Sequence, residues 1–527
     1  MAITKVTSSV LEDNITVAGN LDVSNGTIKL DGNYPTGSGN VALGNAALDD
    51  GSLSGNNNTA VGVSALSANT TGSENVAIGP NALSANVGGA NNIAIGYSSL
   101  GSNISGVRNV AIGAFNGALA ANTANDNTAV GADALKSNTT GTANVAMGTY
   151  ALDANTTANA NTAIGYSALG ANTTGAANVA VGNSALIANS TGSNNVAVGY
   201  NALDAYTSVN TVAIGYAALS ANVSATGCTA VGHQSLEKTT GVNNTGLGYN
   251  VLGQNTTGAD NTAVGSLALD ANTGGSANVS IGYASLTTNT TGNYNTAVGN
   301  EALGANTTAS NSVAVGLNAL ASTTTGINNT ACGRSAGQYI TTGAYNTMLG
   351  SNAGADSPSL RLSTGSGNIC LGFACDVAAP GDSYSVVVGY DLTAKGGSTG
   401  YYGGSGGVYN EANTSTWSTV SDRRIKKNIE DNTTGLDAIK QIQVRNFEYR
   451  TEEEIVDFDN PSVAVVKKEG IQVGVIAQEI EEILPDMIKT QSTGVKSVNP
   501  DNLTWYLVNA VKELSAEVEE LKSRLGD

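Results

Sequence analysis

A short block of the form Asn-(Thr/Val)-Ala-(Val/Ile)-Gly repeats through most of this chain. The block begins at 21 positions between Asn40 and Ser385, and every copy carries its glycine. All but one of the steps between copies are 16–18 residues long; the single step of 22 contains Ser357-Pro358-Ser359. A fixed short period of this kind predicts stacked structural units, one per repeat, rather than a conventional globular domain.

The fullest copies, residues 58–72 and 161–175, show how one repeat folds. Thr/Val, Ala and Val/Ile alternate over a short stretch typical of a β-strand, the block glycine supplies a turn or a close backbone approach, and Asn-Thr-Thr-Gly supplies a second corner. About 17 residues accommodate two short strands and two turns, which is one coil of a parallel β-roll. Because Ala60 and Ala163 occupy the middle of the strand, we expect that nearly flat face to pack against another chain.

Composition agrees with stacked repeats and locates a domain boundary. With 66 glycines and 5% aromatic residues the chain has few large side chains for an ordinary core, yet 41% hydrophobic residues is too apolar for simple disorder. Residues 1–420 hold 8 Lys/Arg and 20 Asp/Glu, whereas the much shorter stretch 421–527 holds 14 and 21. We therefore expect an N-terminal β segment over 1–39, a shaft over 40–390, a Gly/Ser/Tyr-rich connector over 391–420 and a separate domain over 421–527.

Several classes of function are disfavoured by what the sequence lacks. Neither half has a basic patch for nucleic acid, and no run is apolar enough for a signal peptide or for membrane insertion. The cysteine spacing fits neither disulfides nor a metal site, and no cofactor is expected. Cys332 and Cys370 stand where other repeats carry Val, Ile or Leu, which favours buried thiols. His233, the single histidine, is interpreted as a surface variant of one repeat.

The Asn-Val-Ala-Ile-Gly blocks at Asn75 and Asn109 resemble the head repeats of trimeric autotransporter adhesins. The resemblance covers about residues 40–390 and implies a trimeric parallel β-roll. An adhesin of that kind would need an export signal and a C-terminal outer-membrane segment, and we expect neither here. The Thr and Asn ladders are open to two interpretations, a solvated face with turn chemistry or a flat face that binds ice or glycans.

Three motifs in the last 107 residues resemble the intramolecular chaperone auto-processing domain of phage endosialidases and other phage fibres. Ser421-Asp422-Arg423-Arg424-Ile425-Lys426 matches the opening Ser-Asp-x-Arg-x-Lys. The second motif is residues 474–479, in which Gly474, Ala477, Gln478 and Glu479 match, followed by Leu484-Pro485. The third is residues 510–514. The resemblance implies a phage tail fibre or tailspike whose α+β chaperone domain ends in a helix.

The chemistry implied by this resemblance is cleavage of the peptide bond between Val420 and Ser421. Ser421 would supply the nucleophilic hydroxyl, and Lys426 would remove its proton. A lysine can do so only where its ammonium is desolvated or destabilised, which assembly of a trimer could bring about. Lys427 remains an alternative base. Asp422 and Arg424 are assigned either a structural ion pair or a part in the reaction.

The end of the chain carries its own signal for self-association. Apolar residues step by 4, 3, 4, 3 and 4 and are flanked by Glu and Lys, at Leu507, Val511, Leu514, Val518, Leu521 and Leu525. This is a heptad seam, which predicts a coiled coil, and the family resemblance favours a trimer. An amphipathic helix packed on its own domain is the alternative.

Together these patterns predict a structural subunit of a virion fibre or spike. It would be a homotrimer made in the host cytoplasm, in contact with other tail or baseplate proteins and with a host-surface receptor such as a glycan or an outer-membrane component. A depolymerase acting on host polysaccharide is the enzymatic alternative. It would require paired carboxylates, and dispersed ones (Asp133, Asp153, Asp204 and Asp270) are interpreted as a polar edge at one repeat position. An adhesin or ice-binding solenoid of non-viral origin is the third.

Overall fold

The computed structural model describes residues 38–113, 123–356, 361–394, 396–403, 408–410, 423, 426–455, 466, 468–490 and 495–526. Contacts within the chain divide it into two units, Met1–Thr419 and Val420–Asp527. The first unit is almost entirely β-strand and turn, and the second mixes helices with short strands. Each unit is described below by itself.

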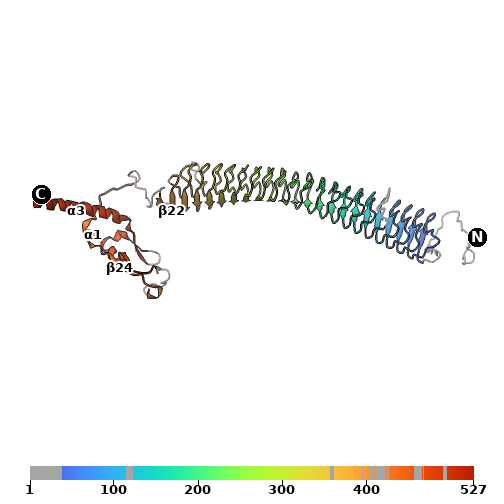
Figure 1. The fold of residues 1–527 in the computed structure, drawn as a ribbon, viewed down its shortest axis with the longest axis horizontal. Coiled ribbons are helices and arrows are strands. Elements are labelled where there is room, and N and C mark those ends of the chain that lie inside the picture. The colour runs from blue at the N-terminus through green and yellow to red at the C-terminus, as the bar shows by residue number, and fades with distance from the viewer. Residues whose placement is uncertain are drawn as a thin grey trace, which may run out of the picture. The chain divides into compact units, whose positions relative to one another are not determined.

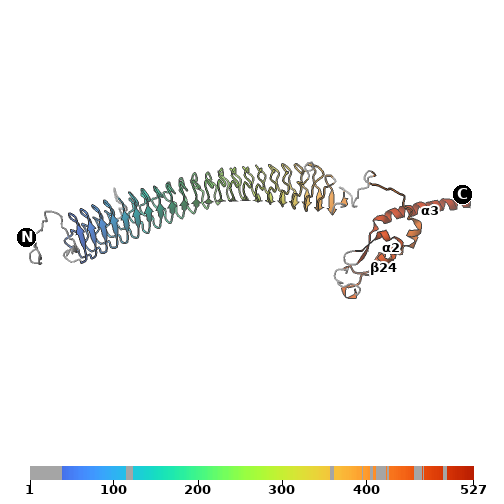
Figure 2. The same cartoon turned by 180° about the vertical axis from the view of Figure 1, so that it is seen from behind.

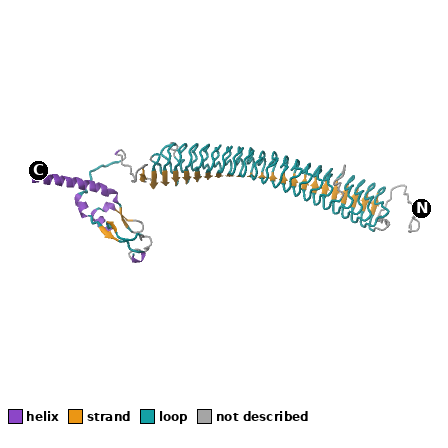
Figure 3. Ribbon diagram, viewed as in Figure 1, coloured by secondary structure: helices purple, strands orange, loops and turns teal. Residues whose placement is uncertain are grey.

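The first unit is a parallel β-solenoid in which each repeat forms one coil (Figure 1). Each of its first 21 strands contains the three residues after the first residue of one block, and the last of them extends to the glycine. Figure 3 shows these strands along one side of the solenoid and the turns along the other, and the reverse view in Figure 2 agrees. The strands are β1 (Val41–Leu43), β2 (Thr59–Val61), β3 (Val76–Ile78), β4 (Ile93–Ile95), β5 (Val110–Ile112), β6 (Thr128–Val130), β7 (Val145–Met147), β8 (Thr162–Ile164), β9 (Val179–Val181), β10 (Val196–Val198), β11 (Val212–Ile214), β12 (Thr229–Val231), β13 (Thr245–Leu247), β14 (Thr262–Val264), β15 (Val279–Ile281), β16 (Thr296–Val298), β17 (Val313–Val315), β18 (Thr330–Cys332), β19 (Thr347–Leu349), β20 (Ile369–Leu371) and β21 (Val386–Gly389).

Neighbouring coils pair in parallel and in strict register, so that equivalent residues of the repeat stack on one another. Ala163 of β8 pairs with Ala146 of β7 on one side and with Ala180 of β9 on the other. At the C-terminal end β22 (Gly400–Gly403) continues the parallel ladder, and β23 (Val408–Asn410) pairs with it in the antiparallel sense. The predicted parallel solenoid of about 17-residue coils is confirmed.

Each described coil holds one strand and not the two that the sequence suggested. The stretch after the block glycine returns through turns, because two of its residues adopt left-handed backbone conformations. In the second coil these are Ser64 and Leu66, with φ of 55° and 52°, and the same two positions recur in most coils. A positive φ is incompatible with an extended strand. Backbone hydrogen bonds nevertheless continue between coils here, as from Leu66 N–H to the carbonyl of Ala82 at 3.0 Å.

The middle alanine of the strand faces the interior of its own coil, which overturns the expectation that it packs against another chain. Ala60 and Ala163 are fully buried and contribute to a core that also contains the leucine of each repeat, such as Leu66. The β-branched residues on either side therefore point outward. Cys332 occupies such an outer position and is exposed, so the prediction that it is buried is wrong, whereas Cys370 occupies the inner position and is buried.

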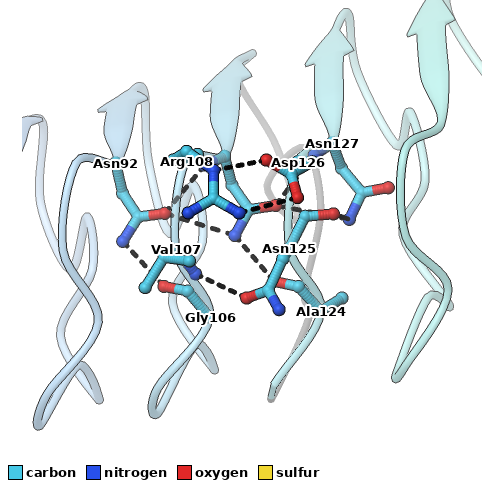
Figure 4. A network of polar contacts seen from close by, with 9 residues as sticks. Asn92, Gly106, Val107, Arg108, Ala124, Asn125, Asp126 and Asn127 are labelled. Atoms are coloured by element: carbon cyan, nitrogen blue, oxygen red, sulfur yellow. Dashed lines mark hydrogen bonds and ion pairs between the residues drawn. The ribbon is translucent and has the colours of Figure 1, made fainter.

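A ladder of buried asparagines runs through the coils at the position before most of the strands. The side-chain oxygen of Asn92 accepts the backbone N–H of Asn109 at 2.9 Å, and the Asn109 oxygen accepts that of Asn127 at 3.0 Å. Figure 4 shows the polar contacts around Asn92 and Asn127. The Asn109 amide also donates to the carbonyl of Ala124 at 2.8 Å, which ties this position to the turn that precedes Asn127. Buried amides satisfied in this way stabilise the stack.

The ladder changes chemistry where Thr211, Cys228, Ser312 or Ser385 stands in place of the asparagine, and the coil around Thr211 shows how the polar atoms stay paired. Tyr206 occupies the position where most coils carry the asparagine of Asn-Thr-Thr, and it is fully buried. Its hydroxyl lies 2.7 Å from that of Thr211 and donates to the carbonyl of Val209 at 2.9 Å. A tyrosine and a threonine thus replace two asparagines while the buried polar atoms remain paired. The exposed ring of His233, a surface residue as expected, stacks between those of Tyr216 and Tyr249.

The second unit packs three helices around a small apolar cluster. Its elements are α1 (Leu436–Gln441), β24 (Arg445–Phe447), η2 (Glu452–Glu454), β25 (Gln472–Gly474), α2 (Ala477–Ile483), η4 (Pro485–Met487), β26 (Ile488–Thr490), β27 (Lys496–Val498), η5 (Pro500–Asn502) and α3 (Leu503–Leu525). Strand β24 pairs with β25 and β26 with β27, both antiparallel. Ile480, Leu484, Met487 and Tyr506 form the buried cluster that joins α2 to α3.

Candidate functional site in the C-terminal unit

The segment predicted to be cut is described in part. Val420, Ser421, Asp422 and Arg424 lie outside the described residues. Lys426 and its neighbour Lys427 are described, and both are exposed in the single chain. The backbone N–H of Lys426 donates to the carbonyl of Arg423 at 3.3 Å. The roles assigned to Ser421 and Lys426 therefore remain predictions, and the described part of the segment places the lysine in contact with solvent.

The second motif holds a strand against a helix. Gly474 is the last residue of β25, Ala477 begins α2, and Gln478 is exposed. Glu479 accepts two hydrogen bonds from the guanidinium of Arg445 on β24, at 2.9 and 3.2 Å. This pairing raises the pKa of the Arg445 guanidinium. Glu479 therefore has a structural contact, and Arg445 is a partner that the motif alone did not identify.

A second polar contact anchors the beginning of α3. The Tyr506 hydroxyl donates to the Asp486 carboxylate, and the Asn502 amide donates to the same oxygen at 2.9 Å. The hydrogen bond from Tyr506 lowers the pKa of Asp486, and the same contact raises the pKa of Tyr506. Since Asp486 belongs to η4 and Tyr506 to α3, this contact fixes the helix to the body of the unit.

One turn further along, α3 contacts the chain that follows the processing segment. The Asn509 amide donates to the carbonyls of Asn432 and Thr434 at 2.9 and 3.1 Å. The Glu513 carboxylate accepts the backbone N–H of Leu436, the first residue of α1, at 2.6 Å. These contacts join residues 75–77 positions apart, so no local sequence pattern predicts them. The only indication in the sequence is that Glu513 belongs to the third motif.

The predicted heptad seam lies on a different face of α3 and is uncovered. Tyr506 and Ala510 are buried against the unit, whereas the seam side chains expose 41–81% of their surface, at Leu507, Val511, Leu514, Val518, Leu521 and Leu525. Helix α3 therefore has two faces in different environments. One face packs on its own unit, and the other presents an apolar stripe to solvent.

The shaft also presents an apolar face. The outward side chains of many strands are 36–47% exposed, at Leu43, Ile78, Ile93, Ile112, Met147, Ile164, Ile214, Leu247, Ile281, Val313, Leu349 and Ile369. These residues share the outer face of one continuous parallel ladder. Exposed apolar patches of such extent mark interaction surfaces.

Asp153 and Asp204, which share one repeat position, stand too far apart to form a glycosidase pair within one chain. Asp153, Asp204 and Asp270 follow the buried leucine of their coils, and burial raises the pKa of each. Asp133 instead precedes its leucine by two residues, so the four do not share one repeat position as expected. Asp153 and Asp204 stand three coils apart, roughly 14 Å at about 4.8 Å per coil. Glycosidase carboxylates are separated by about 5–9.5 Å.

With this geometry in place, the C-terminal unit can be compared with known families. Residues 421–489 match the family model described as the chaperone of endosialidase. The match begins at Ser421 and ends within β26, so it includes the first two motifs but neither α3 nor the third motif. Comparison with curated proteins and with solved structures gave no significant match.

Two further findings bear on the classes of function. No helix of the described ranges is long and apolar enough to cross a membrane. In the same ranges no group of three or more His, Cys, Asp or Glu side chains is arranged to hold a metal ion.

Proposed function

We propose that this chain is a structural subunit of a bacteriophage tail fibre or tailspike, which trimerises through its C-terminal unit and then cuts that unit off before Ser421. The observation that carries the proposal is the match of residues 421–489 to the chaperone of endosialidase, attached to a β-solenoid shaft. A long repetitive solenoid forms contacts far apart in the sequence and folds slowly, which is the situation in which a built-in chaperone is useful.

The partner proposed for both exposed apolar surfaces is another copy of the same chain. The heptad seam of α3 suits a coiled coil of identical helices. The outer face of the shaft repeats along the parallel ladder from β1 to β21, and an equally long surface with the same period covers it best. The surface proposed to lie between chains is therefore the outer face with the β-branched residues. It is not the alanine face expected from the sequence, because the alanines are buried in the coil. A homotrimer uses both surfaces at once.

Self-cleavage is proposed to depend on assembly. A serine hydroxyl needs a base that removes its proton, and a lysine serves as one only after it is desolvated. Lys426 is exposed in the single chain. Burial of this side chain by a neighbouring chain of the trimer would supply the missing environment, and cleavage would then follow correct assembly.

The proposed place of the protein is the virion, after assembly in the host cytoplasm. The N-terminal residues 1–39 would bind other tail or baseplate proteins, and the shaft would contact a receptor on the host surface, a glycan or an outer-membrane component. The exposed turns of the solenoid offer polar side chains in a regular array, as do the stacked rings around His233. We propose no cofactor, nucleic acid or membrane as a partner.

The test compares wild type with Ser421→Ala, Lys426→Ala and Lys427→Ala, each expressed at full length. Wild-type trimers are expected to contain chains of residues 1–420 by mass spectrometry. Ser421→Ala and Lys426→Ala are expected to form uncut trimers, because either change removes a group of the dyad and leaves the seam intact. Lys427→Ala is expected to cut normally. Cutting lost in Lys427→Ala and kept in Lys426→Ala would reassign the base, and full-length wild-type trimers would contradict self-cleavage.

A further inference from the structure

Helix α3 connects two regions that the proposed function treats separately, the trimer seam and the processing segment. Its exposed stripe is the surface for other chains. On a second face, Asn509 and Glu513 contact the residues that follow the processing segment. Asn509 and Glu513 are four residues apart, so they lie one above the other on the same face of the helix.

The contact of Glu513 with α1 is specific in its geometry. Helix α1 begins after Gly435, which has no side chain to cap the helix. The Glu513 carboxylate caps it instead, by accepting the N–H of Leu436 at 2.6 Å, although the two residues are 77 positions apart. A Cβ added to Gly435 would lie 2.3 Å and 2.5 Å from the two carboxylate oxygens. The carboxylate thus covers the glycine directly, and a side chain there would displace it.

Asn509 fixes the chain just before this point. Its amide donates to two carbonyls, those of Asn432 and Thr434, and the Asn432 side chain in turn accepts the backbone N–H of Thr434 at 2.9 Å. Lys426 lies six residues before Asn432, so the intervening chain spans at most about 20 Å even when fully extended. The position of α3 therefore limits where Lys426 can lie.

We propose that Glu513 and Asn509 are positioning residues for self-cleavage: they hold residues 432–436 to the trimer helix, so that the processing segment is placed for the reaction when the three helices associate. This inference rests on the proposed self-cleavage and adds residues outside the matched range 421–489. The reaction itself is unchanged, since neither side chain is assigned a bond to the reacting atoms.

The experiment follows full-length chain during cell-free synthesis, with native gels for trimers and denaturing gels for cleavage in the same samples. The variants are Glu513→Ala, Asn509→Ala and Gly435→Ala, the last of which moves the carboxylate and leaves α3 unaltered. Glu520→Ala is the matched control. It is the same change on the same face seven residues further along, where Glu520 pairs with Arg524 of its own helix at 2.7 Å.

Trimers are expected in all variants, whereas cleavage slows in Glu513→Ala, Asn509→Ala and Gly435→Ala and not in Glu520→Ala. The expected slowing is roughly tenfold or more, since misplacing a reacting group by about 1 Å can cost on the order of 100-fold. Glu513→Gln is expected to restore most of the rate, because the glutamine oxygen still accepts the N–H of Leu436. A Glu513→Gln trimer as slow as Glu513→Ala would show that the charge is needed and would overturn the positioning role.

The remaining outcomes separate this inference from the proposed function. Wild-type trimers that are cut, together with variant trimers cut at the same rate, would overturn the positioning role alone. Loss of trimers in both Glu513→Ala and Gly435→Ala would assign the contact to assembly and also overturn it. Wild-type trimers that stay uncut would contradict self-cleavage and the inference with it.

Discussion

At the residue scale, the shaft depends on leucines held in a backbone conformation that leucine rarely adopts. Leu66 has φ of 52°, and equivalent leucines such as Leu169, at 53°, repeat this value along the solenoid. Such a backbone costs roughly 1–3 kcal/mol per residue. Complete burial of the side chain contributes about 1.5–3 kcal/mol, so it can offset the strain. Glycine would relieve the strain and leave the core empty, which explains why the sequence keeps leucine there.

The block glycines, unlike these leucines, occupy positions where a side chain does not fit. Two glycines of a single coil test this statement. Gly165 has φ of 137°, and a Cβ there would lie 2.4 Å from the carbonyl oxygen of Gly182 in the next coil. A Cβ added to Gly170 would come no closer than 3.3 Å to a neighbouring atom. We predict that Gly165→Ala lowers the unfolding temperature of the shaft and that Gly170→Ala leaves it nearly unchanged, measured by circular dichroism. Equal effects of the two substitutions would refute the close-approach argument.

At the scale of elements, the sequence predicts the period of the repeat and the place of each strand. It does not predict which of the two strand faces points into the core. Alternation in Thr-Ala-Val indicates a strand with two faces, but a period of two does not say which face is inside. For this reason the expectations that Ala163 packs against another chain and that Cys332 is buried are both wrong. The expected second strand is also wrong. The left-handed φ of Leu66 excludes a strand there, and the hydropathy pattern does not reveal this backbone conformation. The contact of Glu513 with Leu436 spans 77 residues, and a single sequence does not reveal such pairs.

Helix α3 provides the prediction at this scale. Leu514→Asp is expected to prevent trimers, because three carboxylates would meet in the seam and each chain would lose burial worth about 1.5–3 kcal/mol. Ala516→Asp, two residues away and off the seam, is the control and is expected to assemble normally. Sedimentation of the full-length proteins measures the outcome. Leu514→Asp trimers as stable as those of Ala516→Asp would mean that the seam does not join the chains.

At the scale of the whole molecule, a shaft with one strand per coil has a particular difficulty in folding. Every strand of the ladder from β1 to β21 pairs with a strand about 17 residues away, so no coil is stable before its neighbours form. The repeats are also nearly identical, and pairing shifted by one whole repeat would preserve most contacts. In the proposed trimer, three chains would moreover have to match their coils with one another. A unit that trimerises early at one end would set a common starting register.

This leads to the last prediction, that a chain ending at residue 420 does not give soluble trimers. Partly formed coils expose strand edges and the apolar outer face, both of which favour aggregation. The full-length Ser421→Ala variant is the control, because it keeps residues 421–527 attached and is expected to assemble at normal yield without being cut. The comparison separates the need for the C-terminal unit from the need for cleavage. Size-exclusion chromatography with light scattering gives the yield and mass of each species. Native trimers from residues 1–420 alone, at the yield of the control, would show that the shaft finds its register without help and would remove the chaperone role from the proposed function.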